Sequence, residues 1–220
     1  QRSLFPPPDE YRMVLWEYGR GIGEVSNRGE SVPTAYASPI SHRSDTYLSR
    51  QVSRLLRLEK KEQVLELIKE VDPRIDDFSL LWPVTEENSP EELNHPGDAV
   101  VHLAVTGVGL VPIQGMGDGL RRALHLACLV AQLGEGGVLV IDEVEVGMHT
   151  SVLKGAFSWL VRACKRSGVQ LFATTHSLEA VDAMLASSED DQLALFRLEP
   201  NRVRRYGGKL LQAARTELGQ

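Results

Sequence analysis

A strand that ends in two carboxylates is the feature that most constrains the fold of this chain. Gly136 and Gly137 precede the apolar run from Val138 to Ile141, which leads directly into Asp142 and Glu143. An apolar run without polar alternation predicts a strand buried on both faces, as strands are in parallel α/β sheets. In such sheets ligands bind beyond the carboxyl ends of the strands, where the two acids would lie.

Two adjacent acids at this place suit metal-assisted phosphate chemistry. One carboxylate can hold Mg²⁺, directly or through water, while the other orients an attacking water molecule. The alternative is a strand that ends in a solvated acidic turn and binds nothing. The residues downstream of Glu143 favour the first interpretation.

A second apolar run delivers a histidine to the same edge of the predicted sheet. A helix is predicted from about Ser151 to Arg166, and residues 169–175 then form another buried strand that ends at His176. The strand segments 138–141 and 171–174 should be parallel neighbours in the core sheet. We therefore expect Glu143 and His176 to lie within reach of one phosphate.

A glycine-rich helix start precedes the first of these strands. Residues 114–119 (QGMGDG) lead into a strongly helical stretch from Leu120 to Val130. The glycines leave backbone N–H groups uncovered, and Asp118 can cap the first turn. An uncovered helix N-terminus favours an anion such as phosphate.

The rest of the chain predicts further helices and strands around this centre. An amphipathic helical pattern runs from Thr46 to Val71, where Asp72 and Pro73 close it. The polar loop at 86–97 is the best internal boundary, which divides the chain into parts 1–97 and 98–220. The other predicted elements are short strands at 34–37, 75–83 and 99–105, a hairpin over 193–206, and a final helix from Lys209.

Composition excludes several classes of protein. The net charge of −6, from 24 Lys and Arg against 30 Asp and Glu, argues against a surface devoted to nucleic acid. Cys128 and Cys164 lie in apolar helical patterns, which predicts reduced core residues of an intracellular protein. No apolar run reaches membrane-spanning length and the first residues are not a signal peptide, so we expect no membrane and a cytoplasmic location.

The order of these motifs resembles the second half of an ABC-type ATPase head. Residues 114–119 occupy the place of the signature motif, and residues 138–143 occupy that of Walker B. Residues 145–149 stand where the D-loop would be, and His176 stands where the switch histidine would be. The resemblance implies a three-layer, P-loop NTPase-like α/β fold with a mostly parallel core sheet.

The residues within these motifs resemble those of a narrower group, the ATP-binding proteins of the overcoming-lysogenization-defect (OLD) type and their stand-alone relatives. Many of these proteins are linked to phage defence. The close matches are 116–122 (MGDGLRR), 142–149 (DEVEVGMH) and 173–177 (ATTHS), within a region from 110 to 185. Looser similarity extends over most of the chain.

The resemblance implies an ATPase with ATP and Mg²⁺ as cofactors. Asp142 would bind Mg²⁺ through water, Glu143 would polarise the attacking water, and His176 would contact the γ-phosphate and sense its loss. The signature residues would clasp the γ-phosphate of a nucleotide held mainly by the opposite subunit, which implies a homodimer around ATP. These signature residues are Gly117, Asp118 and Gly119.

The chain also departs from the pattern of such a head. No Gly-x-x-x-x-Gly-Lys-Ser/Thr occurs, and the nearest lookalike, residues 207–210, lacks both the spacing and the hydroxyl. The usual serine before the signature glycines is absent as well. We therefore expect a C-terminal part of a longer protein, inactive alone, whose partner is the N-terminal part with the P-loop.

Two other functions stay open. A metal-dependent nuclease of the topoisomerase-primase type also places acids after a buried strand, but it needs a further Asp-x-Asp where this chain has Thr174, Thr175 and His176. A non-catalytic dimerisation or docking module is the other alternative. A DNA or defence-protein partner fits the resemblance but is not indicated by the residues themselves.

Overall fold

The chain divides into two units in the computed structural model, residues Gln1–Val32 and Pro33–Gln220. The structure describes residues 32–82, 99–133, 135–188 and 193–207, and the backbone of a short strand pair before them. This pair, β1 (Trp16–Glu17) and β2 (Arg20–Gly21), is antiparallel and belongs to the first unit. All other elements belong to the second unit.

The second unit alternates helices and strands along the chain. Its elements are β3 (Thr34–Ala37), η2 (Ser41–Arg43), α1 (Asp45–Arg57), α2 (Lys61–Val71), β4 (Ile75–Leu81), β5 (Val100–Val105), β6 (Gly109–Pro112), η4 (Ile113–Gly115), α3 (Asp118–Gln132), β7 (Val138–Ile141), α4 (Thr150–Arg166), β8 (Gln170–Ala173), α5 (Leu178–Ser187), β9 (Ala194–Glu199) and β10 (Arg202–Gly207).

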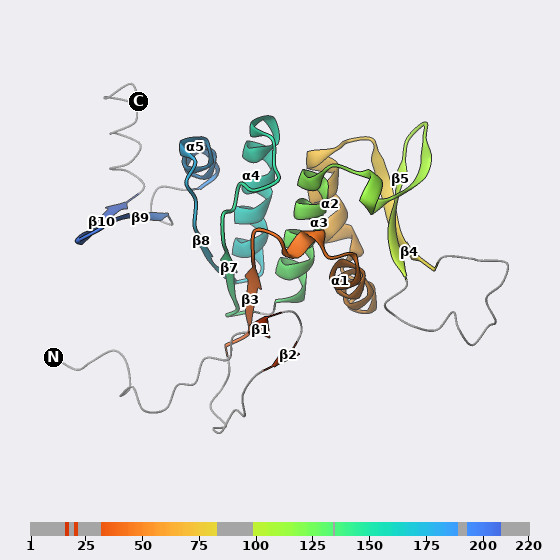
Figure 1. Cartoon of the computed structure of the whole chain (residues 1–220), viewed down its shortest axis with the longest axis horizontal. Coiled ribbons are helices and arrows are strands. Elements are labelled where there is room, and N and C mark those ends of the chain that lie inside the picture. The colour runs from red at the N-terminus through yellow and green to blue at the C-terminus, as the bar shows by residue number, and fades with distance from the viewer. Residues whose placement is uncertain are drawn as a thin grey trace. The chain divides into compact units, whose positions relative to one another are not determined.

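Helices lie between two sheets in this unit. The parallel sheet has the strand order β3-β7-β8, and the antiparallel sheet has the order β4-β5-β6. Figure 1 shows α1 to α4 between them, with the parallel sheet on one side and the antiparallel sheet on the other. The predicted α/β fold with a parallel core sheet is confirmed, although the local sequence pattern does not predict the antiparallel second sheet.

The parallel sheet places three strand ends side by side. In its register Ala37 lies opposite Ile141, and Ile141 lies opposite Ala173. The predicted pairing of residues 138–141 with 171–174 is therefore confirmed. The membership of β3 in this sheet could not be read from its local pattern, because a strand's pairing depends on long-range contacts.

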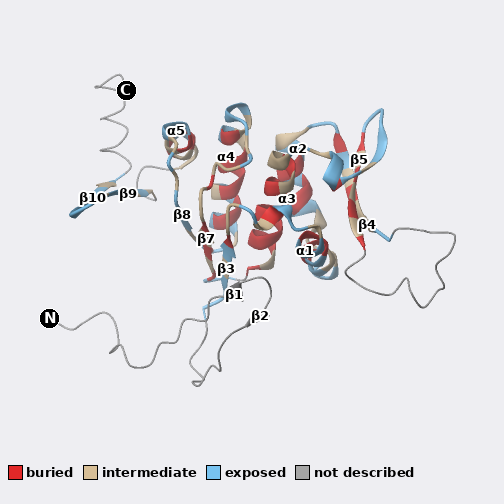
Figure 2. Cartoon of the chain, viewed as in Figure 1, coloured by how far each residue is buried: buried red, intermediate tan, exposed pale blue. Residues whose placement is uncertain are grey.

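The helical layer supplies most of the core. The predicted apolar faces of α1 and α2 are buried, and α3 is buried on nearly every side because it lies between other helices (Figure 2). Such an all-round apolar pattern is typical of a helix inside a protein. The fully buried apolar side chains of α1 and α2 are Leu48, Val52, Leu55, Val64, Leu67 and Ile68.

The predicted single helical run from Thr46 to Val71 is wrong in one respect, because the chain breaks between α1 and α2. Glu59 adopts a φ of 55°, in the left-handed region, directly after the last turn of α1. A left-handed residue after a helix is a common way to end it. After the break, α2 packs as a separate helix against α3.

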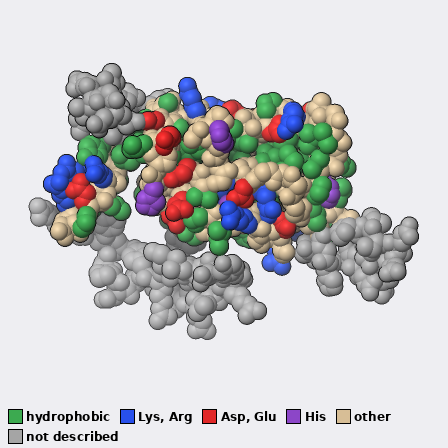
Figure 3. Space-filling model, turned by 45° about the horizontal axis from the view of Figure 1, so that its top comes forward, with side chains coloured by type: hydrophobic (Ala, Val, Ile, Leu, Met, Phe, Trp, Pro, Cys, Tyr) green, Lys and Arg blue, Asp and Glu red, His purple; other side chains and the backbone are tan. Residues whose placement is uncertain are grey.

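The C-terminal part of the described chain is a hairpin, as predicted. Strands β9 and β10 pair antiparallel, and their arginines gather around Glu199 (Figure 3, left). The helix predicted from Lys209 and the boundary predicted at residue 97 both lie outside the described residues, although β4 and β5 on either side of that boundary pair in one sheet. None of the described helices is long and apolar enough to cross a membrane.

Candidate functional site

The carboxyl ends of β7 and β8 are joined by the hydroxyl of Thr174. This hydroxyl donates to Asp142 Oδ1 at 2.5 Å and accepts the backbone N–H of Glu143 at 2.9 Å. The backbone carbonyl of Thr174 accepts the N–H of Val144 at 3.0 Å. The two predicted acids and the strand that leads to His176 therefore form one connected site.

Glu143 has a strained backbone. Its φ of 48° lies in the left-handed region, which costs a non-glycine residue about 1–2 kcal/mol. Strain of this kind persists only where surrounding contacts hold it, and it clusters at functional sites. One of the contacts that hold this turn comes from α3, a helix of the neighbouring layer.

Arg122 of α3 is fully buried, and its guanidinium binds the backbone on which the acids stand. One terminal nitrogen, Nη2, donates to the carbonyl of Asp142 at 3.0 Å and lies 3.5 Å from that of Glu143. The other, Nη1, donates to the carbonyl of Ser38, which follows β3. Burial lowers the pKa of Arg122, while the charges of Asp118 and Asp142 act in the opposite direction.

Sequence reasoning did not assign a role to Arg122. The adjacent arginine, Arg121, does not bind the backbone of the acids, because its side chain donates to Asp45 Oδ1 at 2.6 Å. Arginine is rarely fully buried, so a sequence pattern places it by default on the surface. The only signal was that the resemblance to the signature region extends through both arginines.

Tyr36 is a second residue that sequence reasoning missed. It lies close enough to Asp142 for the charge of that carboxylate to act on its phenol group. Burial, followed by the charge of Asp142, raises the pKa of Tyr36, so the phenol remains a neutral donor. The Asp142 carboxylate thus accepts the hydroxyl of Thr174 from β8 and has the phenol of Tyr36 from β3 in its neighbourhood.

The predicted signature residues form the start of α3. Gly117 is the N-cap residue, and no side chain accepts the first N–H groups of the helix. A Cβ atom added to Gly117 would meet nothing within 4 Å, so this position is open. At Gly119, in contrast, a Cβ atom would lie 2.7 Å from the carbonyl oxygen of Gly147, so the helix start packs directly on the predicted D-loop.

The prediction that Asp118 caps the first turn of this helix is wrong. Its carboxylate instead accepts Arg43 Nη2 at 2.8 Å and lies 3.0 Å from His42 Nε2. Burial acts to raise the pKa of Asp118, but the hydrogen bonds from Arg43 and His42 outweigh it and lower the pKa. Any phosphate bound here would therefore meet the backbone N–H groups and Arg43, not a free carboxylate.

His176 is held at the same edge through the predicted D-loop. Its backbone N–H donates to Glu145 Oε1 at 3.1 Å. Ser177 follows it as the N-cap of α5 and accepts the N–H of Ala180 at 3.1 Å. These two bonds fix the backbone around His176 while its ring is not used in them.

A buried histidine supports the helix start from behind. His125 of α3 is fully buried, with Nδ1 2.7 Å from Gln51 Oε1 and Nε2 2.8 Å from Ser41 Oγ. Burial lowers the pKa of His125 to about 3, so it is neutral at physiological pH. It links α3 to α1 and to η2, but it does not hydrogen-bond to the acids.

The donor set at this edge fits a magnesium ion held mostly by a nucleotide. Mg²⁺ is commonly bound by one or two protein oxygens while phosphates and water supply the rest, and Asp142 with Thr174 can supply that share. The open start of α3 and the side chain of Arg43 fit a phosphate. Among the described residues no three His, Cys, Asp or Glu side chains form a metal-binding group, so the multi-carboxylate centre of the nuclease alternative is not found there.

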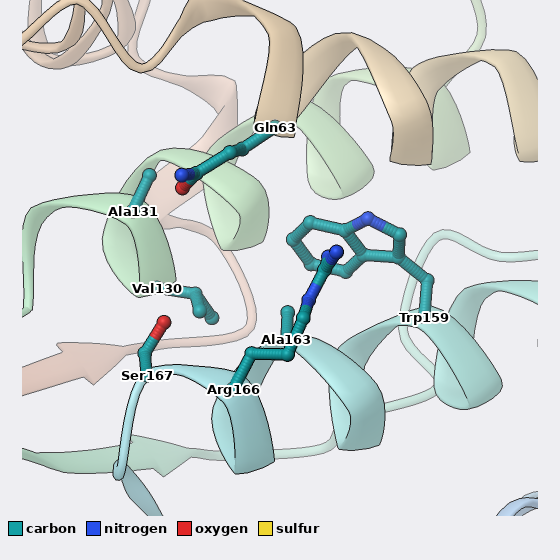
Figure 4. A pocket seen from close by; sticks show the side chains of 7 residues that line it. All are labelled: Gln63, Val130, Ala131, Trp159, Ala163, Arg166 and Ser167. Atoms are coloured by element: carbon teal, nitrogen blue, oxygen red, sulfur yellow. The ribbon is translucent and has the colours of Figure 1, made fainter.

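A small pocket of about 160 Å³ lies elsewhere, between α2 and the C-terminal ends of α3 and α4. Figure 4 shows the side chains of Trp159 and Arg166 on one wall and Gln63 on the other. None of the predicted site residues lines it. The candidate site is thus the edge of the parallel sheet and not this pocket.

A family model described as "AAA domain, putative AbiEii toxin, Type IV TA system" matches residues 18–182. The chain belongs to this AAA-domain family. The match includes the start of α3, both acids and His176. It supports the expectation of an ATPase-type protein at family level, while the narrower OLD assignment is not tested by it.

The AAA-domain chain is also similar to a curated protein from an archaeon. It is 41% identical over 70 residues to "Uncharacterized protein MJECL11" of Methanocaldococcus jannaschii. The matched part covers 32% of the chain and 60% of that protein. The chain therefore spans less than two thirds of the length of this relative.

Solved structures show which fold the family member has. A structure described as "Structural biochemistry of ATP-driven dimerization and DNA stimulated activation of SMC ATPases" matches with a TM-score of 0.50 at 12% identity, over 77% of this chain and 98% of the other. "Crystal structure of the SmcHead bound to the C-winged helix domain of ScpA" matches with a TM-score of 0.50 at 15% identity, over 77% and 51%. The fold is thus that of an ATPase head.

Proposed function

We propose that this chain supplies the γ-phosphate side of an ATP site in an ABC-type ATPase head. Glu143 polarises the water that attacks the γ-phosphate, Asp142 holds Mg²⁺, and His176 contacts the γ-phosphate. Stabilisation by positioned donors and a metal is the general means by which such sites accelerate phosphoryl transfer. Hydrolysis therefore depends on the placement of the Asp142–Glu143 turn.

The observation that carries this proposal is the network around that turn. Thr174 binds Asp142 and the Glu143 N–H, while Arg122 binds the carbonyls behind both acids. A solvated acidic turn would need neither a buried arginine nor a left-handed glutamate. The network instead fixes the carboxylate of Asp142 and the backbone of Glu143 before any ligand arrives, which is the preorganisation that a catalytic site requires.

The start of α3 has a different task in this proposal. Its open N-terminus at Gly117 and the neighbouring Arg43 bind the γ-phosphate of a nucleotide carried by the opposite subunit. Two chains would then enclose ATP between them. The packing of Gly119 on Gly147 would connect this phosphate contact to the loop after Glu143.

The narrower context is part of the same proposal. The residues of the motifs support an OLD-type protein. The matched family is described as a putative toxin of a toxin–antitoxin system, which supports a role in defence. DNA-stimulated activation, described for one of the SMC ATPases of similar fold, supports DNA as a partner. The lack of a P-loop motif in the sequence supports a chain that forms the C-terminal part of the head.

The test is the Glu143→Gln substitution in the complete protein that carries the P-loop. The amide keeps the shape of the side chain but cannot take part in activating water. We expect ATP hydrolysis to fall by at least about 100-fold, the lower end of what a positioned general base contributes. ATP-dependent dimerisation, measured by light scattering, should be kept or strengthened.

A matched control is available at the other end of the same strand. Glu135 is exposed and precedes β7, so Glu135→Gln should leave both hydrolysis and dimerisation unchanged. If Glu143→Gln hydrolysed ATP at the wild-type rate, Glu143 would not be the catalytic carboxylate and the proposed function would fail.

A further inference from the structure

A row of arginine and hydroxyl side chains runs along the outer face of α1. The inner face of this helix packs against α3 and β5, so α1 is buried along one side and exposed along the other (Figure 2). At the helical spacings of three and four residues, the outer side carries Thr46, Arg50, Ser53, Arg54 and Arg57. Guanidinium and hydroxyl groups are among the side chains that contact the phosphates of nucleic acids.

The three arginines of this row, the arginine stripe of α1, have no acid to pair with. The side chains of Arg50, Arg54 and Arg57 make no hydrogen bond or ion pair with any residue that the structure describes. The sequence contains no Asp or Glu between Asp45 and Glu59. The arginines of α3 and α4 differ, because each of them binds a carboxylate or a backbone carbonyl: Arg121, Arg122, Arg162 and Arg166.

The stripe is unfavourable for the helix itself. Arg50 and Arg54 are four residues apart, and Arg54 and Arg57 are three apart, so like charges are neighbours on the helix surface and repel one another. The helix dipole favours cations in the last turn, which accounts for Arg54 and Arg57 but not for Arg50 in the middle of the helix. An anion that binds all three guanidinium groups removes the repulsion.

The other cluster of arginines, in the hairpin of β9 and β10, does not have this character. Arg197, Arg202 and Arg204 surround Glu199, which neutralises part of their charge. The hairpin also exposes apolar side chains such as Leu198, which is 78% exposed. Among the described residues, the stripe of α1 is therefore the row of cations that is free to bind an anion.

The length of the stripe fits a row of phosphates. Arg50 and Arg57 are seven residues apart, which is about 10 Å along the helix axis at about 1.5 Å per residue. Duplex DNA carries one phosphate charge per about 1.7 Å of its axis, so about six phosphates lie along such a length. Three guanidinium groups in a straight row therefore meet regularly spaced phosphates without a change in the packing of α1.

We infer that the arginine stripe of α1 binds the phosphate backbone of double-stranded DNA. The inference rests on the proposed function, which includes DNA as a partner, and it names the surface that contacts the DNA. A protein partner fits less well, because the buried centre of a protein interface is apolar and the stripe has no apolar residue at its centre. The net charge of −6 disfavours DNA elsewhere on the chain, so a local row of cations without acids is where contact is favoured.

The experiment measures the binding of a fluorescently labelled DNA duplex of about 30 base pairs to the 220-residue chain by anisotropy, without nucleotide. Three phosphate contacts predict that the logarithm of the binding constant falls with the logarithm of the salt concentration with a slope of about −2.7. Binding should therefore weaken about 40-fold between about 50 and 200 mM salt.

Two triple variants with the same change in net charge test the surface. In the stripe variant all three arginines become glutamine, which forms helices about as well as arginine. This variant should bind DNA at least about tenfold more weakly and with a flatter salt dependence. The control carries Arg74→Gln, Arg162→Gln and Arg166→Gln, at exposed arginines that each pair with an acid, and should bind like the wild type. Circular dichroism should show both variants folded.

Every other result would overturn the inference. These results are an unchanged affinity in the stripe variant, an equal loss in the control, and no binding by the wild type at low salt. Tighter binding of single-stranded DNA, or displacement of the duplex by polyglutamate at equal charge concentration, would assign the stripe to another partner. Because no nucleotide is present, these outcomes leave the proposed ATP site standing. DNA binding through the stripe together with wild-type hydrolysis by Glu143→Gln would refute only the proposed function.

Discussion

Replacement of Arg122 by methionine should destabilise the chain more than replacement of any exposed arginine would. The guanidinium makes two good hydrogen bonds, to the carbonyls of Ser38 and Asp142, and a long one to Glu143. Hydrogen bonds to a charged group contribute about 1.5–3 kcal/mol each, so their loss costs about 3–6 kcal/mol. Part of this loss is offset because methionine has no charge to bury. Burial penalises the charged guanidinium, as the lowered pKa of Arg122 indicates.

The net loss should be about 3 kcal/mol, the lower end of what removal of one partner from a buried charged contact costs. Urea unfolding followed by circular dichroism measures it. With an m-value of about 2 kcal/mol/M, the midpoint should fall by about 1.5 M. The midpoint of Arg122→Lys should lie between those of the wild type and Arg122→Met, because one ammonium group cannot reach carbonyls on separate loops.

The control for this prediction is Arg50→Met on the exposed face of α1, which should change stability by no more than about 0.5 kcal/mol. If Arg122→Met unfolded at the same urea concentration as Arg50→Met, the guanidinium would not hold the Asp142–Glu143 turn. The account of Arg122 as the residue that positions the acids would then be wrong.

Three further outcomes can be measured on the chain. Because the pKa of His125 is about 3 when folded and about 6.5 when unfolded, the free energy of unfolding falls as the pH drops below 6.5. Urea unfolding should therefore show that the difference in this free energy between wild type and His125→Asn shrinks by about 2 kcal/mol between pH 7 and pH 5. A constant difference would contradict the low pKa. Gly119→Ala should cost about 1–3 kcal/mol in thermal unfolding because its Cβ would meet the carbonyl of Gly147, whereas Gly117→Ala should melt like the wild type; equal melting would refute the close contact. Calorimetry should detect no micromolar binding of Mg-ATP to the isolated chain, and such binding would reveal an unrecognised phosphate loop.

The Gly119 contact also changes how the signature residues should be tested. The sequence alone predicts that Gly119→Asp blocks the dimer by placing a charge at the phosphate-facing helix start. The structure shows that any side chain at this position meets the predicted D-loop first. Gly117→Asp is the cleaner test of the phosphate contact, because that position is open.

Local sequence patterns were sufficient for the elements that carry the predicted catalytic groups. The unbroken apolar run before Asp142 predicted β7, and the similar run before His176 predicted β8 as its parallel neighbour. The helix between them followed from apolar periodicity and ended before Gly168, as expected. The positions and the pairing of these elements were predicted correctly because apolar periodicity and glycine breaks act within a few residues of chain. The prediction that residues 169–175 form a buried strand is wrong, because most residues of β8 are exposed.

Only the tertiary structure revealed how these groups are held. Arg122 lies 20 residues before Asp142 in the chain, and Tyr36 lies in a strand that several helices and the antiparallel sheet separate from β7 along the sequence. No periodic pattern of residues records contacts between segments that lie so far apart in the chain.

The burial of Arg122 shows the physical reason for this limit. An arginine in a helical pattern is expected on the surface, since burial of a charge is costly unless several acceptors surround it. The acceptors here are carbonyls of Ser38, Asp142 and Glu143, and they come together only when the sheet and the helical layer have packed. The sequence alone therefore determined which residues stand at the ends of the strands, and the packing of the layers decided which other residues hold them in place.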